Sequence, residues 1–130
     1  PFFLGDLPHA WVGSDYVRSV LDMFAYTREA DGALVIAAGI PNDWLDGEGI
    51  AVENLRTPYG KLSYTLRRDK GVLRLTINKG MQLPAGGVVL PWPAAGQPGN
   101  TRINGKPATW NNGELRITAL PAEVLIEPAK

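Results

Sequence analysis

Residues 49–68 hold the pattern that most restricts how this chain can fold. Leu62, Tyr64 and Leu66 alternate with polar side chains, and a period of two places one set in a core and the other in water. An apolar stretch precedes them, and the segment between, 57–60, reads Thr-Pro-Tyr-Gly. Proline pre-sets φ for a turn and glycine accepts positive φ. The sequence therefore predicts two antiparallel strands joined by a tight turn.

Short strands separated by Gly, Pro or Asn turns continue to the end of the chain. Further strands are expected over residues 33–38, 72–78, 88–90, 115–118 and 123–127. Asn-Gly at 104–105 and at 112–113 is a strong hairpin signal, because both residues accept the positive φ of a type I′ turn. About eight short strands at this spacing are typical of an antiparallel β-sandwich.

The continuous apolar run at 33–38, Ala-Leu-Val-Ile-Ala-Ala, differs from the alternating strands. A short run of this kind suits a strand that is buried on both faces, although periodicity alone leaves a helix open. A glycine before it and a Gly-Ile-Pro segment after it mark its ends.

One amphipathic helix is expected in front of the sandwich. Ser14 or Asp15 can cap it, and apolar side chains spaced by three and four residues predict a helix over about 14–28. Its apolar stripe comprises Tyr16, Val17, Val20, Leu21, Met23 and Phe24. One short helix cannot bury so wide a stripe alone, and the chain also begins with an apolar run. We therefore expect residues 1–30 to be the tail of an upstream domain, and residues 31–130 to be the sandwich.

Composition restricts the partners and cofactors. The formal net charge is zero, with 13 basic and 13 acidic residues, whereas nucleic acids and anionic membranes attract basic patches. No apolar run reaches the roughly 18–20 residues that span a bilayer. The chain has no cysteine and one histidine, so it offers neither thiolate ligands nor a usual metal-ligand set. We expect no nucleic acid, membrane, metal or cofactor, and the compartment stays open.

Catalytic groups are sparse. His9, Ser14 and Asp15 lie close in sequence, but helix capping explains the serine and no Gly-x-Ser-x-Gly elbow is present. Paired carboxylates of the glycosidase type are conceivable among the acidic residues Asp43, Asp46, Glu48 and Glu53. In turns and beside strands such carboxylates are usually only solvated, so no catalytic residue is predicted.

Tryptophans offer a candidate binding surface. Trp44, Trp92 and Trp110 all lie near expected turns, and an aromatic face can pack against the apolar face of a pyranose. Together they form a possible sugar platform. The alternative is that aromatic side chains beside turns plug the ends of the sandwich.

Four short segments stand in order along residues 9–91. They are His-Ala-Trp-Val-Gly-Ser at 9–14, the apolar-striped segment 15–26, a strand, Thr-x-Tyr-Gly turn and strand over 50–64, and Leu-Pro-Ala-Gly-Gly-Val-Val-Leu-Pro at 83–91. In this order they resemble the carboxy-terminal region of (α/α)6-barrel glycoside hydrolases, especially the α-L-rhamnosidase-like group. In that family the last barrel helix is followed directly by a small antiparallel β-sandwich.

The resemblance implies a non-catalytic accessory domain of a carbohydrate-active enzyme. The catalytic carboxylates would lie in an upstream barrel of the same polypeptide, which would be the partner that the sandwich braces. The family's loop before the last helix can border the sugar pocket, which implies substrate contacts for His9 and, less directly, Trp11. The pattern ends after Trp92, and the tail 102–130 has no counterpart in it.

Two other functions stay open. The first is an autonomous carbohydrate-binding module that uses Trp44, Trp92 or Trp110. The second is a structural or interaction domain without a role in sugar binding.

Overall fold

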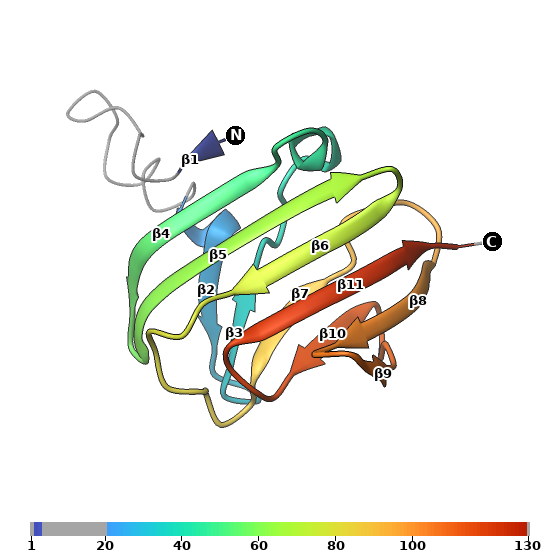
Figure 1. Cartoon of the computed structure of the whole chain (residues 1–130). Helices are drawn as coiled ribbons and strands as arrows, with labels where there is room; N and C mark the ends of the chain where they lie inside the picture. Colours follow the sequence, from blue (N-terminus) through green and yellow to red (C-terminus); the bar gives the residue numbers. More distant parts are fainter. Residues whose placement is uncertain (1, 4–20, 130) are drawn as a thin grey trace.

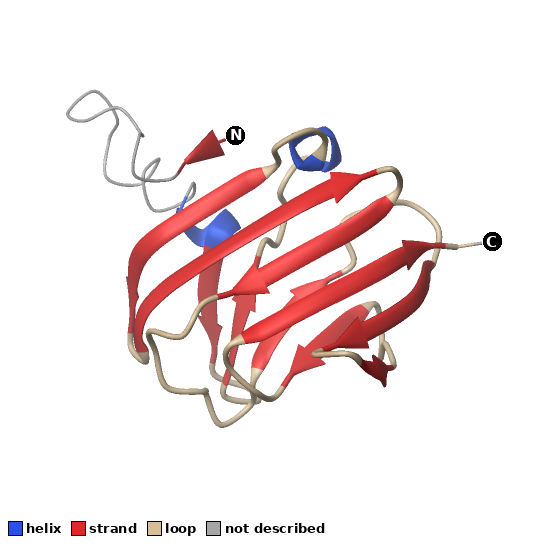
Figure 2. Ribbon diagram, in the orientation of Figure 1, coloured by secondary structure: helices blue, strands red, loops and turns tan. Residues whose placement is uncertain are grey.

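The computed structural model describes residues 2–3 and 21–129, and strands dominate this part of the chain (Figure 2). Two sheets face each other across one core (Figure 1). Within the described residues the larger sheet has seven strands in the order β1-β4-β5-β6-β11-β8-β9, and the smaller has four in the order β10-β7-β3-β2. The predicted antiparallel-rich β-sandwich is confirmed.

The larger sheet contains β1 (Phe2–Phe3), β4 (Ile50–Thr57), β5 (Gly60–Asp69), β6 (Val72–Ile77), β8 (Pro98–Ile103), β9 (Lys106–Ala108) and β11 (Ala122–Pro128). The smaller contains β2 (Ala25–Arg28), β3 (Ala33–Ile36), β7 (Val88–Pro91) and β10 (Glu114–Ile117). A 3-10 helix, η2 (Asn42–Leu45), lies between β3 and β4, and residues 21–24 are helical. The described strands outnumber the eight expected because β1, β2 and β9 span only two, four and three residues. An alternation of apolar and polar side chains is hard to recognise in strands so short.

The core lies where the inward faces of the two sheets meet. Leu62, Tyr64 and Leu66 of β5 are at most 1% exposed, as their alternation predicts. Neighbouring strands of the larger sheet add Leu73, Leu75, Ile77, Val124 and Ile126, and the smaller sheet adds Leu34, Ile36, Leu90, Leu115 and Ile117. Removing this apolar surface from water is the main force that holds the two sheets together.

The β4–β5 hairpin has the predicted tight turn. The Thr57 hydroxyl accepts the Tyr59 N–H at 3.1 Å and donates to the Gly60 carbonyl at 2.8 Å. The ladder is interrupted between Val52 and Leu55, where Asn54 has φ +55° and its N–H donates to the Ser63 hydroxyl at 2.9 Å. An interruption of this kind bends a strand and discourages pairing with other chains.

Strand β3 is buried on both faces, as the apolar run predicts. It pairs with β2 in antiparallel fashion and with β7 in parallel. Its Leu34 and Ile36 belong to the main core, whereas Ala33 and Val35 form a second buried cluster with Val89. The period of two places this second cluster on the outer face of the smaller sheet.

The predicted helix over 14–28 is wrong at its carboxyl end. Residues 25–28 form strand β2, which pairs with β3 in the register Ala25 to Ile36 and Arg28 to Ala33. The helical segment ends at Phe24, whose carbonyl accepts the Ala37 N–H at 3.2 Å and the Tyr64 hydroxyl at 2.7 Å. Both bonds come from partners distant in sequence, which local periodicity cannot report.

The predicted apolar stripe also needs correction. Phe24 is fully buried in this chain's own core instead of facing an upstream domain. Leu21 and Met23 are partly buried against the same core. The remaining members of the stripe, and the start of the helix, lie outside the described residues. The division of the chain at residue 30 stays a prediction, although β2 belongs to the same sheet as β3.

Candidate functional site

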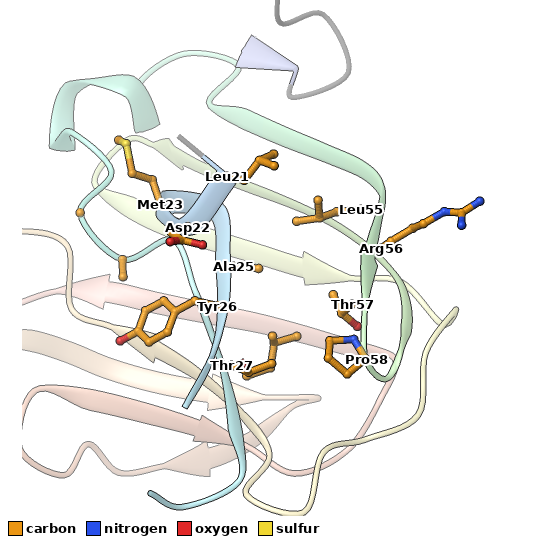
Figure 3. A pocket seen from close by; sticks show the side chains of 13 residues that line it. Leu21, Asp22, Met23, Ala25, Tyr26, Thr27, Leu55, Arg56, Thr57 and Pro58 are labelled. Carbon is orange, nitrogen blue, oxygen red and sulfur yellow. The ribbon is translucent and has the colours of Figure 1, made fainter. Parts of the chain in front are cut away.

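A groove opens on one side of the sandwich, between the edge strand β2 of the smaller sheet and strand β4 of the larger (Figure 3). Its volume is about 1260 Å³. Leu21, Ala25 and Thr27 line one wall, and Leu55 and the turn that follows β4 line the other.

The groove is poor in groups for acid–base chemistry. Among its described lining residues only Asp22 and Arg56 carry a full charge, and Figure 3 shows the Arg56 side chain directed away from the groove. These described lining residues include no carboxylate pair. Its shape and apolar walls suit contact with another polypeptide better than a reaction on a small molecule.

Two of the three candidate platform tryptophans lie together at the other side of the sandwich. The ring centroids of Trp92 and Trp110 are 5.4 Å apart, with the ring planes at 79°. The Trp110 Nε1 donates to the hydroxyl of buried Thr101 at 2.8 Å. In this edge-to-face arrangement the two rings do not form one flat stacking surface. Trp44 lies on η2 and is 37% exposed.

A cavity of about 340 Å³ lies beside Trp92. Its walls come from η2, from the β5–β6 hairpin, from residues 92–97 and from the end of β11. Arg68 is its only described charged lining residue. The Arg68 Nε lies 3.3 Å from the Asp46 carboxylate and its Nη2 donates to the Asn42 carbonyl at 2.8 Å.

A charged network crosses the outer face of the smaller sheet. The Arg28 guanidinium donates to Glu114 at 2.7 and 3.0 Å and to Asp31 at 2.7 and 3.1 Å. Arg116 adds a contact to Asp31 at 3.1 Å and donates to the Gly86 carbonyl.

The hydrogen bonds of this network shift the pKa values of Asp31 and Arg28. Hydrogen bonds from Arg28, and more weakly from Arg116 and the Ala33 N–H, hold the pKa of Asp31 well below its usual range. Hydrogen bonds to Asp31 and Glu114 raise the pKa of Arg28. The aliphatic stems of long basic side chains commonly cover apolar surface, and Arg116 pairs with Val89 of the nearby buried cluster across the β7–β10 ladder.

The structure locates some predicted site residues and not others. His9 and Trp11 lie outside the described residues, so their substrate contacts stay predictions, and so does the three-tryptophan platform. The carboxylates Asp43, Asp46 and Glu48 are exposed. Over residues 2–3 and 21–129, no three His, Cys, Asp or Glu side chains lie close enough to hold a metal ion.

Sequence reasoning missed the groove and the cavity. Both are lined by residues from several elements that are far apart in the chain, such as Leu21 with Leu55 and Asn42 with Pro128. The run of small residues at 94–96, next to Pro93, was the local sign, because such a loop segment can follow the rim of a cavity.

Searches of protein-family models, curated proteins and solved structures find no match for this chain. Within the part of the chain that the structure describes, every helix is too short or too polar to cross a membrane.

Proposed function

We propose that this chain is a non-catalytic accessory β-sandwich of a glycoside hydrolase, and that it braces the catalytic barrel of the same polypeptide. The groove between β2 and β4 carries this proposal, because the described residues leave this side of the sandwich open, with apolar side chains such as Leu21, Met23 and Leu55 in its lining. The glycoside hydrolase class comes from the resemblance over residues 9–91.

The position of the groove favours a neighbour that precedes the sandwich in the chain. Leu21, Asp22 and Met23, which lie shortly before β2 in the chain, line it. Strand β1 pairs with β4 only at Ile50 and Ala51. The rest of β4 therefore has one described strand neighbour, β5, and borders the groove on its other side. A domain that joins the chain from this direction would meet the open side first.

The edges of the groove limit unwanted pairing. Glu53 and Arg56 are exposed on β4, and the interruption between Val52 and Leu55 bends that strand. Charged side chains and bulges on edge strands suppress association through backbone hydrogen bonds. The groove is thus better suited to side-chain packing against a folded domain than to strand exchange between copies.

Association of two polypeptides tests the proposal. The region of the gene upstream of this sequence is expected to encode an (α/α)6 barrel, which is expressed separately and mixed with this chain. Thr27→Arg places a charge at the exposed groove wall, and Thr65→Arg makes the same change on an exposed residue of β5 outside the groove. We expect Thr27→Arg to weaken association at least tenfold and Thr65→Arg to leave it unchanged.

Calorimetric titration measures the dissociation constant of each variant for the barrel, and circular dichroism shows whether each variant is folded. An upstream region that encodes no barrel, or equal binding by the two variants, would contradict the proposal.

A further inference from the structure

The cavity beside Trp92 shares no lining residue with the groove between β2 and β4. Its volume of about 340 Å³ is at the small end of the range for ligand sites, which begins near 300 Å³. It therefore fits one small ring better than an extended chain. Four separate elements build it, so its shape depends on the whole fold rather than on one loop.

The base of the cavity is apolar. Leu45 and Leu73 line it and are at most 4% exposed. Pro93 and Pro128 add rigid apolar surface, and the Trp92 indole completes the lining. An aromatic ring in such a wall packs against C–H groups of a ligand.

The position of Trp92 is set by packing. Trp110 holds it in the edge-to-face contact with ring centroids 5.4 Å apart. The Trp92 Nε1 is enclosed and has no hydrogen-bond partner. Buried donors are almost always paired, so hydrogen bonding does not explain the position of this side chain. Trp92 is held by packing against the main core and Trp110, and it gives apolar surface to the cavity.

The cavity has little net charge to offer an ion. Arg68 forms an ion pair with Asp46, with the Nε and the carboxylate oxygen 3.3 Å apart, although this buried Nε has no hydrogen-bond partner. The Arg68 Nη2 donates to the backbone carbonyl and the side-chain oxygen of Asn42. An anion would have to compete with the Asp46 carboxylate, whereas a neutral ligand would not disturb the pair.

Two exposed amides supply the remaining polar groups. Asn42 and Gln97 line the cavity and are exposed. The Asn42 side-chain oxygen accepts from Arg68, so Asn42 offers mainly its amide N–H groups, whereas the Gln97 amide can both donate and accept. These groups match the hydroxyl groups of a sugar. An apolar base with an uncharged donor and acceptor rim is complementary to a ring with one C–H face and hydroxyls around its edge.

We propose that this cavity binds a single neutral pyranose residue. The ring stacks its C–H face on the apolar base that includes Trp92, and its hydroxyls exchange hydrogen bonds with Asn42 and Gln97. The barrel partner plays no role in this site, so the proposal stands or falls separately from the bracing function.

Nuclear magnetic resonance of the 15N-labelled full chain tests the site. The indole N–H signal of Trp92 is assigned by its loss in Trp92→Phe. Neutral methyl glycosides of rhamnose, glucose and galactose are titrated, with methyl glucuronide as the anionic probe. We expect a saturable shift of the Trp92 signal with at least one neutral glycoside, and weaker binding of the glucuronide.

Two glutamine variants complete the test. Gln97→Ala removes a rim amide, and Gln82→Ala removes an exposed glutamine outside the cavity. Loss of one hydrogen bond is expected to weaken binding about three- to tenfold in Gln97→Ala and to leave Gln82→Ala unchanged. The proposal is overturned if no neutral glycoside shifts the Trp92 signal, if the two variants bind equally, or if only signals from groove residues move.

Discussion

The hydroxyl of Tyr64 donates a hydrogen bond to the backbone carbonyl of Phe24 at 2.7 Å, across 40 positions of sequence. Tyr64 lies in the middle of β5 and is 1% exposed. Phe24 is the last helical residue before β2, and its carbonyl also accepts the Ala37 N–H. This contact joins the larger sheet to the point where the chain changes from helix to strand.

Tyr64→Phe is expected to lower the free energy of unfolding by about 1–2 kcal/mol, because a buried hydrogen bond is lost while the ring stays packed. Urea denaturation followed by circular dichroism measures the change as a lower midpoint at constant slope. Tyr59→Phe, on a half-buried tyrosine of the β4–β5 turn, is the matched control. An equal effect of the two variants would argue against the bond to Phe24.

Tyr64 also predicts a loss of stability at alkaline pH. Burial raises the pKa of Tyr64 above its ordinary value near 10. Above that pH the unfolded chain releases the proton while the folded chain keeps it, so the free energy of unfolding falls as the pH rises. Denaturation midpoints measured from pH 8 to pH 11 should fall less steeply in Tyr64→Phe than in the natural chain. Parallel curves would contradict the assignment.

Asp31 predicts a loss of stability at acidic pH. Its pKa is held well below the ordinary value, chiefly by the hydrogen bond from Arg28. The stabilisation is present above about pH 4, the ordinary range of an aspartate, and is lost as the pH falls below it. Asp31→Asn should therefore lower the melting temperature at pH 7 and flatten its decline between pH 4 and pH 2. Asp43→Asn, at an exposed residue of η2, is the control and should keep the natural profile.

The two paired tryptophans should respond differently to the same substitution. Trp110→Phe removes the bond to Thr101, and we expect that loss to cost about 1 kcal/mol. Trp92→Phe removes a donor that has no partner. We therefore expect only the smaller loss in the free energy of unfolding that comes from reduced packing. Chemical denaturation of both variants measures the difference. A larger cost for Trp92→Phe would show that its Nε1 is paired in solution.

Gly47 and Gly49 have similar backbone φ angles, so alanine at these two positions distinguishes the cost of a strained backbone from the cost of a steric clash. Gly49 and Gly47 have φ of +73° and +70°. A Cβ on Gly49 would lie 2.2 Å from the Leu66 carbonyl oxygen, whereas one on Gly47 would have no atom within 4 Å. Gly47→Ala should cost about 1 kcal/mol from the left-handed backbone alone. Gly49→Ala should lower the free energy of unfolding clearly more, because β4 and β5 must move apart to accept the added Cβ. Thermal melts of both variants measure the difference.

Much of the sandwich was predictable because its information is local. Leu62, Tyr64 and Leu66 alternate with polar residues, and a strand with one wet face needs no more than that alternation. The Asn-Gly dipeptide at 104–105 joins β8 to β9, with Asn104 at φ +51°. The apolar run at 33–38 suited the doubly buried strand β3, since burial on both faces leaves no place for polar side chains, but periodicity alone had left a helix open.

The candidate sites were less predictable because they arise from contacts between distant segments. Trp92 and Trp110 were both candidates from sequence, but only the packed sheets place one ring edge-on to the other. The ion pair between Arg68 and Asp46, which balances the charge of the described charged lining residue of the cavity, likewise depends on how η2 meets the β5–β6 hairpin.

By itself, the sequence determined the alternating strands, their turns and the sandwich class, because each follows from the conformational preferences of a few adjacent residues. The tertiary structure alone decided that residues 25–28 leave the helix and become β2. Those residues gain a hydrogen-bonded ladder with β3, and the Phe24 carbonyl gains Tyr64 and Ala37 as donors. The free energy of these distant hydrogen bonds, together with the burial of Phe24, outweighs the local preference to continue a helix.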